Sequence, residues 1–213
     1  MKNVIFIAPP SAGKGTQSKE LINLGYDHIS TGDMLREEIN KKSDLGLKIE
    51  DIMKSGSLVS DDIVFELINK RLKNNSKPFI LDGFPRTLNQ AKLLDNLFNE
   101  LNIDNYEVVY LDIAMEEALK RALGRLTCEC GASYNIYYEP LKPKCDGVCD
   151  VCGKALVRRG DDNEESFRNR FSTFLENNEP IKEFYNSKNR LHVIDATIGN
   201  EIVTDKIRNI LDI

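Results

Sequence analysis

The apolar and polar residues of the chain form short apolar runs that alternate with longer amphipathic segments. Five runs rich in β-branched and aromatic residues predict buried strands, at 4–8, 26–30, 79–82, 108–112 and 191–195. Apolar residues recur at helical spacing between them, and the expected helices cover 17–24, 31 onward, 45–54, 63–73, 90–101, 115–123, 164–174, 181–185 and 201–211. This alternation predicts an α/β fold with a five-stranded parallel sheet covered by helices on both faces.

The segment 126–162 departs from this pattern, because it is rich in turns and tyrosines and holds all five cysteines. A secreted disulfide scaffold would spread its cysteines through the chain, whereas local clustering favours a metal site. Cys149-Asp150-Val151-Cys152-Gly153 has the C-x-x-C-G spacing of half a zinc site. The other half, Cys128-Glu129-Cys130-Gly131, is one residue shorter, so its thiolates reach one metal only if the backbone bends there.

A zinc ion in this segment would be structural, since four thiolates leave no open position for catalysis. Cys145 lies close enough in sequence to replace one ligand. The alternative is a reduced, metal-free segment held by apolar contacts of Tyr134, Tyr137 and Tyr138. The predicted ligand set is Cys128, Cys130, Cys149 and Cys152.

Composition and charge exclude several classes of protein. The 213 residues are 41% hydrophobic and 30% charged, which is typical of a globular chain rather than a disordered one. The net charge of −5 argues against broad binding to nucleic acid or anionic membranes. No apolar run approaches the roughly 20 residues that span a bilayer, and the N-terminus lacks the pattern of a signal peptide. We therefore expect a cytoplasmic protein without nucleic-acid or membrane partners.

The first predicted strand ends in a loop of small residues, Pro9 to Thr16, and a helix follows. Strand, small-residue loop, lysine, hydroxyl and helix together are typical of a phosphate cradle, in which backbone N–H groups and the lysine face the anion. The match to G-x-x-x-x-G-K-[ST] is imperfect, because Ala8 stands at the first glycine and Gly15 follows Lys14. The alternative is an ordinary strand–turn–helix with an exposed lysine.

A second candidate site follows the strand at 79–82. Asp82 ends this strand, and Gly83-Phe84-Pro85-Arg86-Thr87 leads into the next helix. An acid at the carboxyl end of a strand is commonly where the Mg²⁺ of a bound nucleotide is reached, although it also serves as a helix cap.

Five features occur together in one chain: the phosphate loop, 30–36, 81–87, the cysteine-bearing segment, and Arg159-Gly160-Asp161-Asp162 with Arg170 beyond. With these motifs in this order, essentially the whole chain resembles the adenylate kinases, of the long-lid bacterial type whose lid carries zinc. The segment Asp-Gly-Phe-Pro-Arg at 82–86 is highly specific to nucleoside monophosphate kinases.

The resemblance implies reversible phosphoryl transfer from ATP, with Mg²⁺, to AMP, giving two ADP. It implies a P-loop core at 1–29, 60–124 and 163–213, a flap over AMP at 30–59 and a lid over ATP at 125–162. The implied ATP-binding residues are Ser11, Ala12, Gly13, Lys14, Gly15, Thr16, Arg125, Ser133, Tyr134 and Ile198. The implied AMP-binding residues are Thr31, Arg36, Ser57, Leu58, Val59, Gly83, Phe84, Pro85, Arg86, Gln90, Arg159 and Arg170. The implied catalytic residues are Lys14, Arg86, Arg121, Arg125, Arg159 and Arg170.

These roles agree with the chemistry of the residues. Phosphoryl transfer asks a protein mainly for positioning and charge neutralisation, and arginine binds phosphate oxygens bidentately without losing its proton. One departure from the family is Ser11, which stands where glycine is usual; glycine permits positive φ and close approach to phosphate.

Two other functions remain open. A related kinase would phosphorylate CMP, UMP or GMP, and a zinc-bearing binding module would hold ATP only as a structural ligand. We expect a monomer, as most of the family are.

Overall fold

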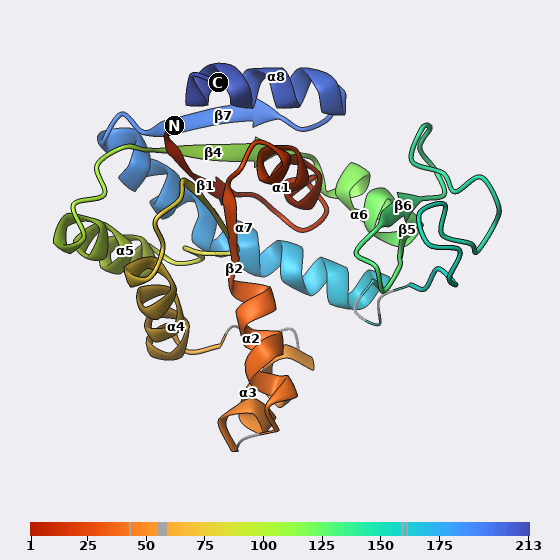
Figure 1. Cartoon of the computed structure of the whole chain (residues 1–213), viewed down its shortest axis with the longest axis horizontal. Coiled ribbons are helices and arrows are strands. Elements are labelled where there is room, and N and C mark those ends of the chain that lie inside the picture. Colours follow the sequence, from red (N-terminus) through yellow and green to blue (C-terminus); the bar gives the residue numbers. More distant parts are fainter. Residues whose placement is uncertain (43, 55–58, 159, 161) are drawn as a thin grey trace.

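The predicted parallel sheet is the centre of the molecule. The computed structural model describes residues 1–42, 44–54, 59–158, 160 and 162–213. The sheet has the strand order β2-β3-β1-β4-β7, with all neighbouring strands parallel (Figure 1). Its strands are β1 (Asn3–Ile7), β2 (Asp27–Ser30), β3 (Phe79–Asp82), β4 (Tyr106–Asp112) and β7 (Leu191–Asp195). All five strands expected from the apolar runs are therefore confirmed.

The two faces of the sheet carry separate apolar clusters, because alternate strand residues point to opposite sides. Ile5 and Ile7 belong to one cluster, and Val4 and Phe6 to the other. The first cluster is completed by residues of α2 (Thr31–Asn40), α3 (Asp44–Lys54), α4 (Asp61–Lys73) and α5 (Leu88–Glu100). The second is completed by residues of α1 (Lys14–Asn23), α6 (Met115–Gly124) and α8 (Asn200–Leu211). Burial on both faces explains why the central strands β3, β1 and β4 are largely apolar.

Helix α7 (Glu164–Ser187) differs from the sequence expectation, because one helix replaces the two helical stretches at 164–174 and 181–185. The polar residues before Pro180 lack an apolar period, and a proline removes one helical hydrogen bond. Tertiary contacts keep the helix continuous through Pro180. Asn178 is buried and donates from Nδ2 to the Tyr110 hydroxyl at 3.0 Å, and Ile181 packs in the first core cluster.

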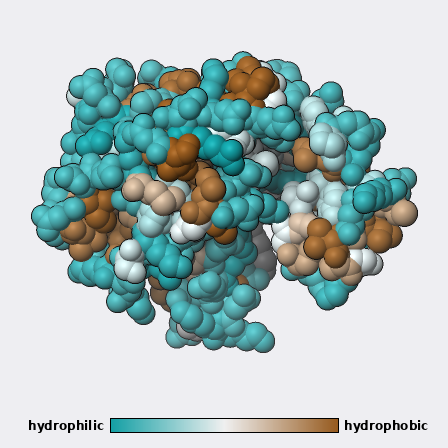
Figure 2. All heavy atoms as spheres, turned by 45° about the horizontal axis from the view of Figure 1, so that its top comes forward, coloured by the Kyte–Doolittle hydropathy of each residue, from teal (hydrophilic) through white to brown (hydrophobic). Residues whose placement is uncertain are grey.

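The segment 125–162 forms a lobe beside the sheet, at the right in Figure 1. Its regular structure is the antiparallel pair β5 (Arg125–Thr127) and β6 (Ser133–Asn135), with single bridges from Thr127 to Val157 and from Val148 to Ala155. Figure 2 shows a mostly hydrophilic face, with apolar side chains gathered on this lobe, where Val148, Val151 and Val157 are exposed. None of the helices in the described part of the chain has the length and apolarity needed to cross a membrane.

Candidate active site

The loop between β1 and α1 is shaped by two residues with positive φ. Gly13, the N-cap of α1, has φ +103°, and Ser11 has φ +61°. A side chain disfavours this left-handed region, which gives a physical reason for the usual glycine at Ser11. A Cβ added to Gly13 or Gly15 would meet none of the described atoms within 4 Å. The start of α1 therefore faces open space, where N–H groups and the helix dipole favour an anion.

Lys14 is held at the end of β1 by this loop. Its Nζ donates a hydrogen bond to the Ala8 carbonyl at 2.8 Å. Burial lowers the pKa of Lys14, and the nearby charges of Arg86 and Arg125 lower it further, while Asp82 opposes them. The positive charges of Arg86 and Arg125 thus both act on Lys14, and such a cluster of cations favours the binding of an anion. Of the other predicted loop residues, Ala12 is buried and Thr16 is exposed on α1.

Asp82 ends β3 beside β1, where its register partner is Phe6. Burial alone would raise the pKa of Asp82. The adjacent His28 and the charges of Lys14 and Arg86 outweigh burial, so the pKa of Asp82 lies below its ordinary value. His28 Nε2 is 3.5 Å from the carboxylate. The carboxyl ends of β1 and β3 are where ligands of such sheets bind, because the strand order changes direction there.

The side of the site predicted for AMP is assembled from α2 and the β3–α5 loop. Thr31, buried at the start of α2, donates from Oγ1 to the Asp82 carbonyl at 3.3 Å. Gly83 has φ +84°, and a Cβ there would lie 2.5 Å from Thr31 Oγ1, so only glycine fits. Arg86 donates from Nε to the Gly83 carbonyl at 2.8 Å. Phe84 and Pro85 are buried beneath this loop.

Other residues predicted for AMP differ in exposure. Arg36 is exposed and pairs with Asp33 in the first turns of α2. Gln90 is buried, with its side-chain amide bonded to the Arg86 backbone and to a carboxylate of α4. Val59 is also buried, whereas Ser57 and Leu58 lie outside the described residues.

The arginines predicted to surround the transferred phosphoryl group lie at the base of the lid. Arg125 makes a two-pronged pair with Asp162, including Nε to Oδ2 at 2.8 Å, and Arg170 is 3.7 Å from the same carboxylate. Arg121 donates to Glu117 at 3.1 Å and to the Ala196 carbonyl at 3.0 Å. Arg159 lies outside the described residues. The structure thus places Arg125 and Arg170 together, with Asp162 as a shared anion.

The residues predicted for the ATP ribose and adenine come from separate segments. Ser133 is exposed on β6, and Ile198 is half-buried in the loop between β7 and α8. The Tyr134 hydroxyl is 3.5 Å from Cys149 Sγ and accepts the Asp150 N–H at 2.8 Å. That hydroxyl is engaged within the lid, so Tyr134 would contact a nucleotide through other atoms.

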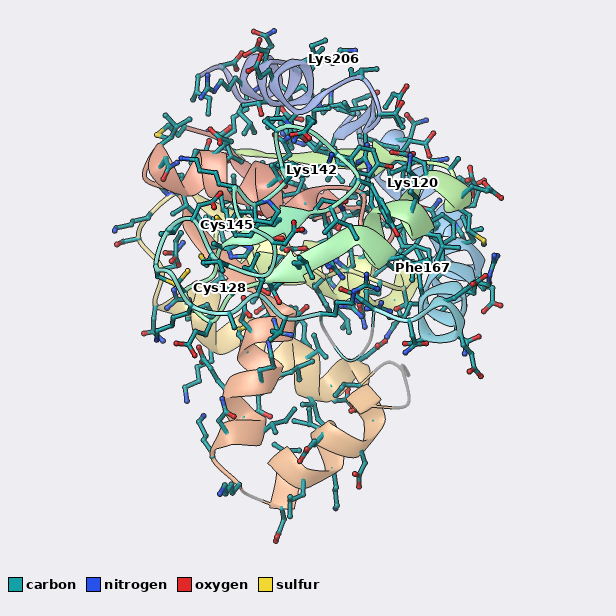
Figure 3. All side chains as sticks on the ribbon, turned by 90° about the vertical axis from the view of Figure 1, so that its right-hand side faces the viewer. Lys120, Cys128, Lys142, Cys145, Phe167 and Lys206 are labelled. Atoms are coloured by element: carbon teal, nitrogen blue, oxygen red, sulfur yellow. The ribbon has the colours of Figure 1, made fainter. Side chains whose placement is uncertain are left out.

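The cysteines of the lid converge as the sequence predicted. The Sγ atoms of all four predicted ligands lie within 4.8 Å of one another, and Cys145 is outside the group. Figure 3 labels Cys128 and Cys145 in this segment. Cys128 and Cys152 are 3.4 Å apart, and Cys130 and Cys149 are 3.6 Å apart. A tetrahedral zinc site with Zn–S of about 2.3 Å has S···S edges of about 3.8 Å, so the spacing suits one ion.

The bend required at the shortened first half is present. Gly131 has φ +85°, and its N–H donates to the Cys128 carbonyl at 3.0 Å, which turns Cys130 back toward Cys128. The second half has the matching turn, in which the Gly153 N–H donates to the Cys149 carbonyl at 2.9 Å. Both turns place a pair of thiols on one side, as a metal requires.

Sequence reasoning missed two acids at the site. In the sequence, Asp162 stands out only as part of the motif at 159–162, and nothing singles out Asp61. The structure shows Asp162 buried against Arg125 and Asp61 bonded to Gln90. Asp162 could have been found from the sequence, because an acid close to several predicted phosphate-binding arginines is a candidate ion-pair partner for them. An acid at the start of a helix is ordinary, so Asp61 carried no signal.

The five-stranded parallel sheet, the helices that cover it and the loop between β1 and α1 define an α/β fold of the P-loop kinase type. The family model described as Adenylate kinase matches residues 6–190. Curated adenylate kinases are similar along their whole length. That of Thermosipho melanesiensis is 43% identical, covering 98% of this chain and 99% of its own, and that of Thermosipho africanus is 44% identical with the same coverage. The adenylate kinase of Archaeoglobus fulgidus is 44% identical, covering 99% of this chain and 98% of its own.

The chain therefore belongs to the adenylate kinase family. Membership makes it a nucleotide-binding transferase of the kinase class, and similarity over the full length supports ATP:AMP phosphotransfer. Neither alternative, a kinase for other monophosphates or a zinc-bearing binding module, is favoured by these relatives.

Proposed function

We propose that the chain transfers the γ-phosphoryl group of ATP to AMP at the carboxyl ends of β1 and β3. The observation that carries this proposal is the set of cations near the strand ends: Lys14 is bonded to the Ala8 carbonyl at the end of β1, and Arg125 and Arg170 share Asp162. An AMP phosphate oxygen forms a bond to the γ-phosphorus, and the bond from that phosphorus to the β,γ-bridging oxygen breaks. Two ADP result, and the reverse reaction uses the same groups.

The proposed roles follow from position. Residues 11–16 bind the ATP phosphates, with Lys14 following the charge as it moves from the γ- to the β-phosphate. Arg86 holds the AMP phosphate. It lies on the same loop as Gly83, to whose carbonyl it donates, and Gly83 in turn lies against Thr31. Arg125 and Arg170, with Arg121 and Arg159, neutralise the equatorial oxygens of the transferred group. Asp162 holds Arg125 and Arg170 ready, and phosphate oxygens would take its place as their partner.

The division into a core, a flap at 30–59 and a lid at 125–162 is part of the proposal. Closure of both over the nucleotides would exclude water, which otherwise would accept the phosphoryl group. We also propose that the protein acts as a cytoplasmic monomer that binds neither nucleic acid nor membrane, in keeping with its net charge of −5.

Mg²⁺ is expected with ATP, and Asp82 suits it. The carboxylate stands at the strand end beside the phosphate loop, and the cations around it keep its pKa low, so it is ionised when ATP binds. Asp82 would hold the metal, directly or through water, and the metal would supply positive charge that neutralises the phosphates. Zinc in the lid is proposed on the four converging thiols and would have a structural role only.

A coupled assay across AMP, CMP, UMP and GMP, with ATP as donor, tests the function. We expect AMP to be the preferred acceptor by at least about tenfold in kcat/KM, because Thr31 and Gln90 match the residues that read adenine in the family. Comparable or better turnover with CMP or UMP would overturn the assignment of AMP.

A further inference from the structure

The amide of Gln90 is held by two partners of opposite chemical character. The backbone N–H of Arg86 donates to Gln90 Oε1 at 2.6 Å, and Gln90 Nε2 donates to Asp61 Oδ1 at 2.6 Å. Gln90 is only 2% exposed. An N–H can only donate, and an ionised carboxylate can only accept. The chemistry of these partners therefore fixes which end of the amide is oxygen and which is nitrogen.

Asp61 is itself held in place by the start of α5. Its other oxygen, Oδ2, accepts from Asn89 Nδ2 at 3.0 Å and lies 3.5 Å from the Thr87 hydroxyl. That hydroxyl caps α5 by accepting the Gln90 N–H at 3.1 Å. Asp61, at the first position of α4, thus joins two helices and presents one oxygen to the Gln90 amide.

A glutamine amide has two N–H donors and two acceptor lone pairs, and these contacts use one of each. With respect to the described residues, the amide retains one donor and one acceptor, in a fixed order. Adenine offers the complement, an amino group at position 6 beside a ring nitrogen that accepts. Guanine and hypoxanthine carry an oxygen at position 6 beside a protonated N1, so they present like groups to the same amide.

We propose that Asp61 is a positioning residue that makes the site specific for a 6-amino purine, by preventing the Gln90 amide from rotating end over end. A rotated amide would suit a 6-oxo purine. It would also turn its oxygen to the Asp61 carboxylate and its NH₂ group to the Arg86 N–H, losing two hydrogen bonds and creating two like-group contacts. The inference rests on the proposed AMP site, and it adds the group that orients the base reader.

The test compares AMP with IMP, which differs only at position 6 and N1. Asp61→Asn is nearly isosteric and offers the Gln90 amide either an oxygen or an NH₂ group. Replacing a charged partner by an adaptable neutral one removes about half of the barrier to rotation. We expect the ratio of kcat/KM for AMP over IMP to fall by about tenfold, with kcat/KM for AMP within about threefold of wild type.

Asp62→Asn is the matched control. Asp62 is the next residue of the same helix start, it is exposed, and its replacement changes net charge and helix dipole equally. We expect the AMP/IMP ratio of this variant to remain that of wild type. Asp61→Ser, whose hydroxyl donates or accepts, is a second variant at the key position and should also lower the ratio.

Equilibrium binding of AMP and IMP by calorimetry separates this inference from the proposed function. If AMP turns over but the ratio is unchanged in Asp61→Asn and Asp61→Ser, the orienting role is wrong and the function stands. If AMP does not turn over, but wild type binds it in preference to IMP and Asp61→Asn narrows that preference, the function fails and the orienting role stands. Equal losses for both nucleotides, an equal change in Asp62→Asn, or no binding preference in wild type would each overturn the inference.

Discussion

The strand ends of the parallel sheet and the cysteine-bearing lid hold their functional side chains by different means. At the strand ends, Lys14 and Asp82 follow strands that are buried on both faces, so the core fixes their positions. The lid has two three-residue strands and exposes Val148, Val151 and Val157. A segment with so little buried apolar surface needs another source of order, and four converging thiols provide one.

The largest effect should come from the strand ends. Lys14→Ala removes the cation that the phosphate loop presents, so we expect kcat to fall by about 10³-fold. The free energy of unfolding should change by no more than about 1 kcal/mol, because Lys14 is half-buried and makes one bond to the Ala8 carbonyl. Steady-state kinetics and urea unfolding measure both.

Lys206→Ala, an exposed lysine of α8 labelled in Figure 3, is the control and should retain wild-type kinetics. Retention of more than a tenth of the wild-type kcat in Lys14→Ala would mean that transfer occurs elsewhere. If Lys14→Ala left the protein's function intact while removal of zinc abolished it, the alternative of a zinc-bearing binding module would be favoured.

The lid should respond to its metal. Cys149→Ser removes a buried thiol from the four-cysteine group, so we expect zinc content to fall from about one ion per chain toward none. Proteolysis within 125–162 should accelerate at least about tenfold, while cleavage of the core stays slow. Metal analysis, limited proteolysis and melting curves provide the measurements.

Cys145→Ser is the matched control, because Cys145 belongs to the same segment but lies outside the group. It should keep zinc and the wild-type cleavage pattern. Melting and proteolysis that do not change after chelation would refute the idea that metal orders the lid.

The smallest effect concerns the phosphate loop. Ser11 has φ +61°, and among the described atoms its buried hydroxyl has no hydrogen-bond partner. Ser11→Gly relieves the left-handed strain but adds freedom to the unfolded chain, so we expect a net gain of about 0.5 kcal/mol in free energy of unfolding. Ser11→Ala keeps the Cβ and its strain and should be nearly neutral. An equal gain from alanine would show that strain is not the cause. Chemical denaturation of the three proteins resolves the difference.

The sheet was predictable because its three central strands, β3, β1 and β4, are largely apolar runs. The phosphate loop was predictable because its residue types serve one chemistry. The spacing favoured Cys128, Cys130, Cys149 and Cys152 but left Cys145 open as a ligand. The turn at Gly131, which brings the shortened pair together, became visible only in the structure. The continuity of α7 through Pro180 was not predictable, since a buried contact between Asn178 and Tyr110 supports a stretch with no local signal. The β5–β6 pair was equally hidden, because strands of three residues show no alternation.

The pairing of Arg125 with Asp162 has a consequence for how such proteins are built. It joins the first residue of the segment 125–162 to its last. The Thr127–Val157 bridge joins the same two stretches of chain again, a few residues further from the core. A segment whose two ends meet can be exchanged for a shorter or longer one without moving the scaffold that it leaves and rejoins. The segment 125–162 is in this sense a cassette on the core.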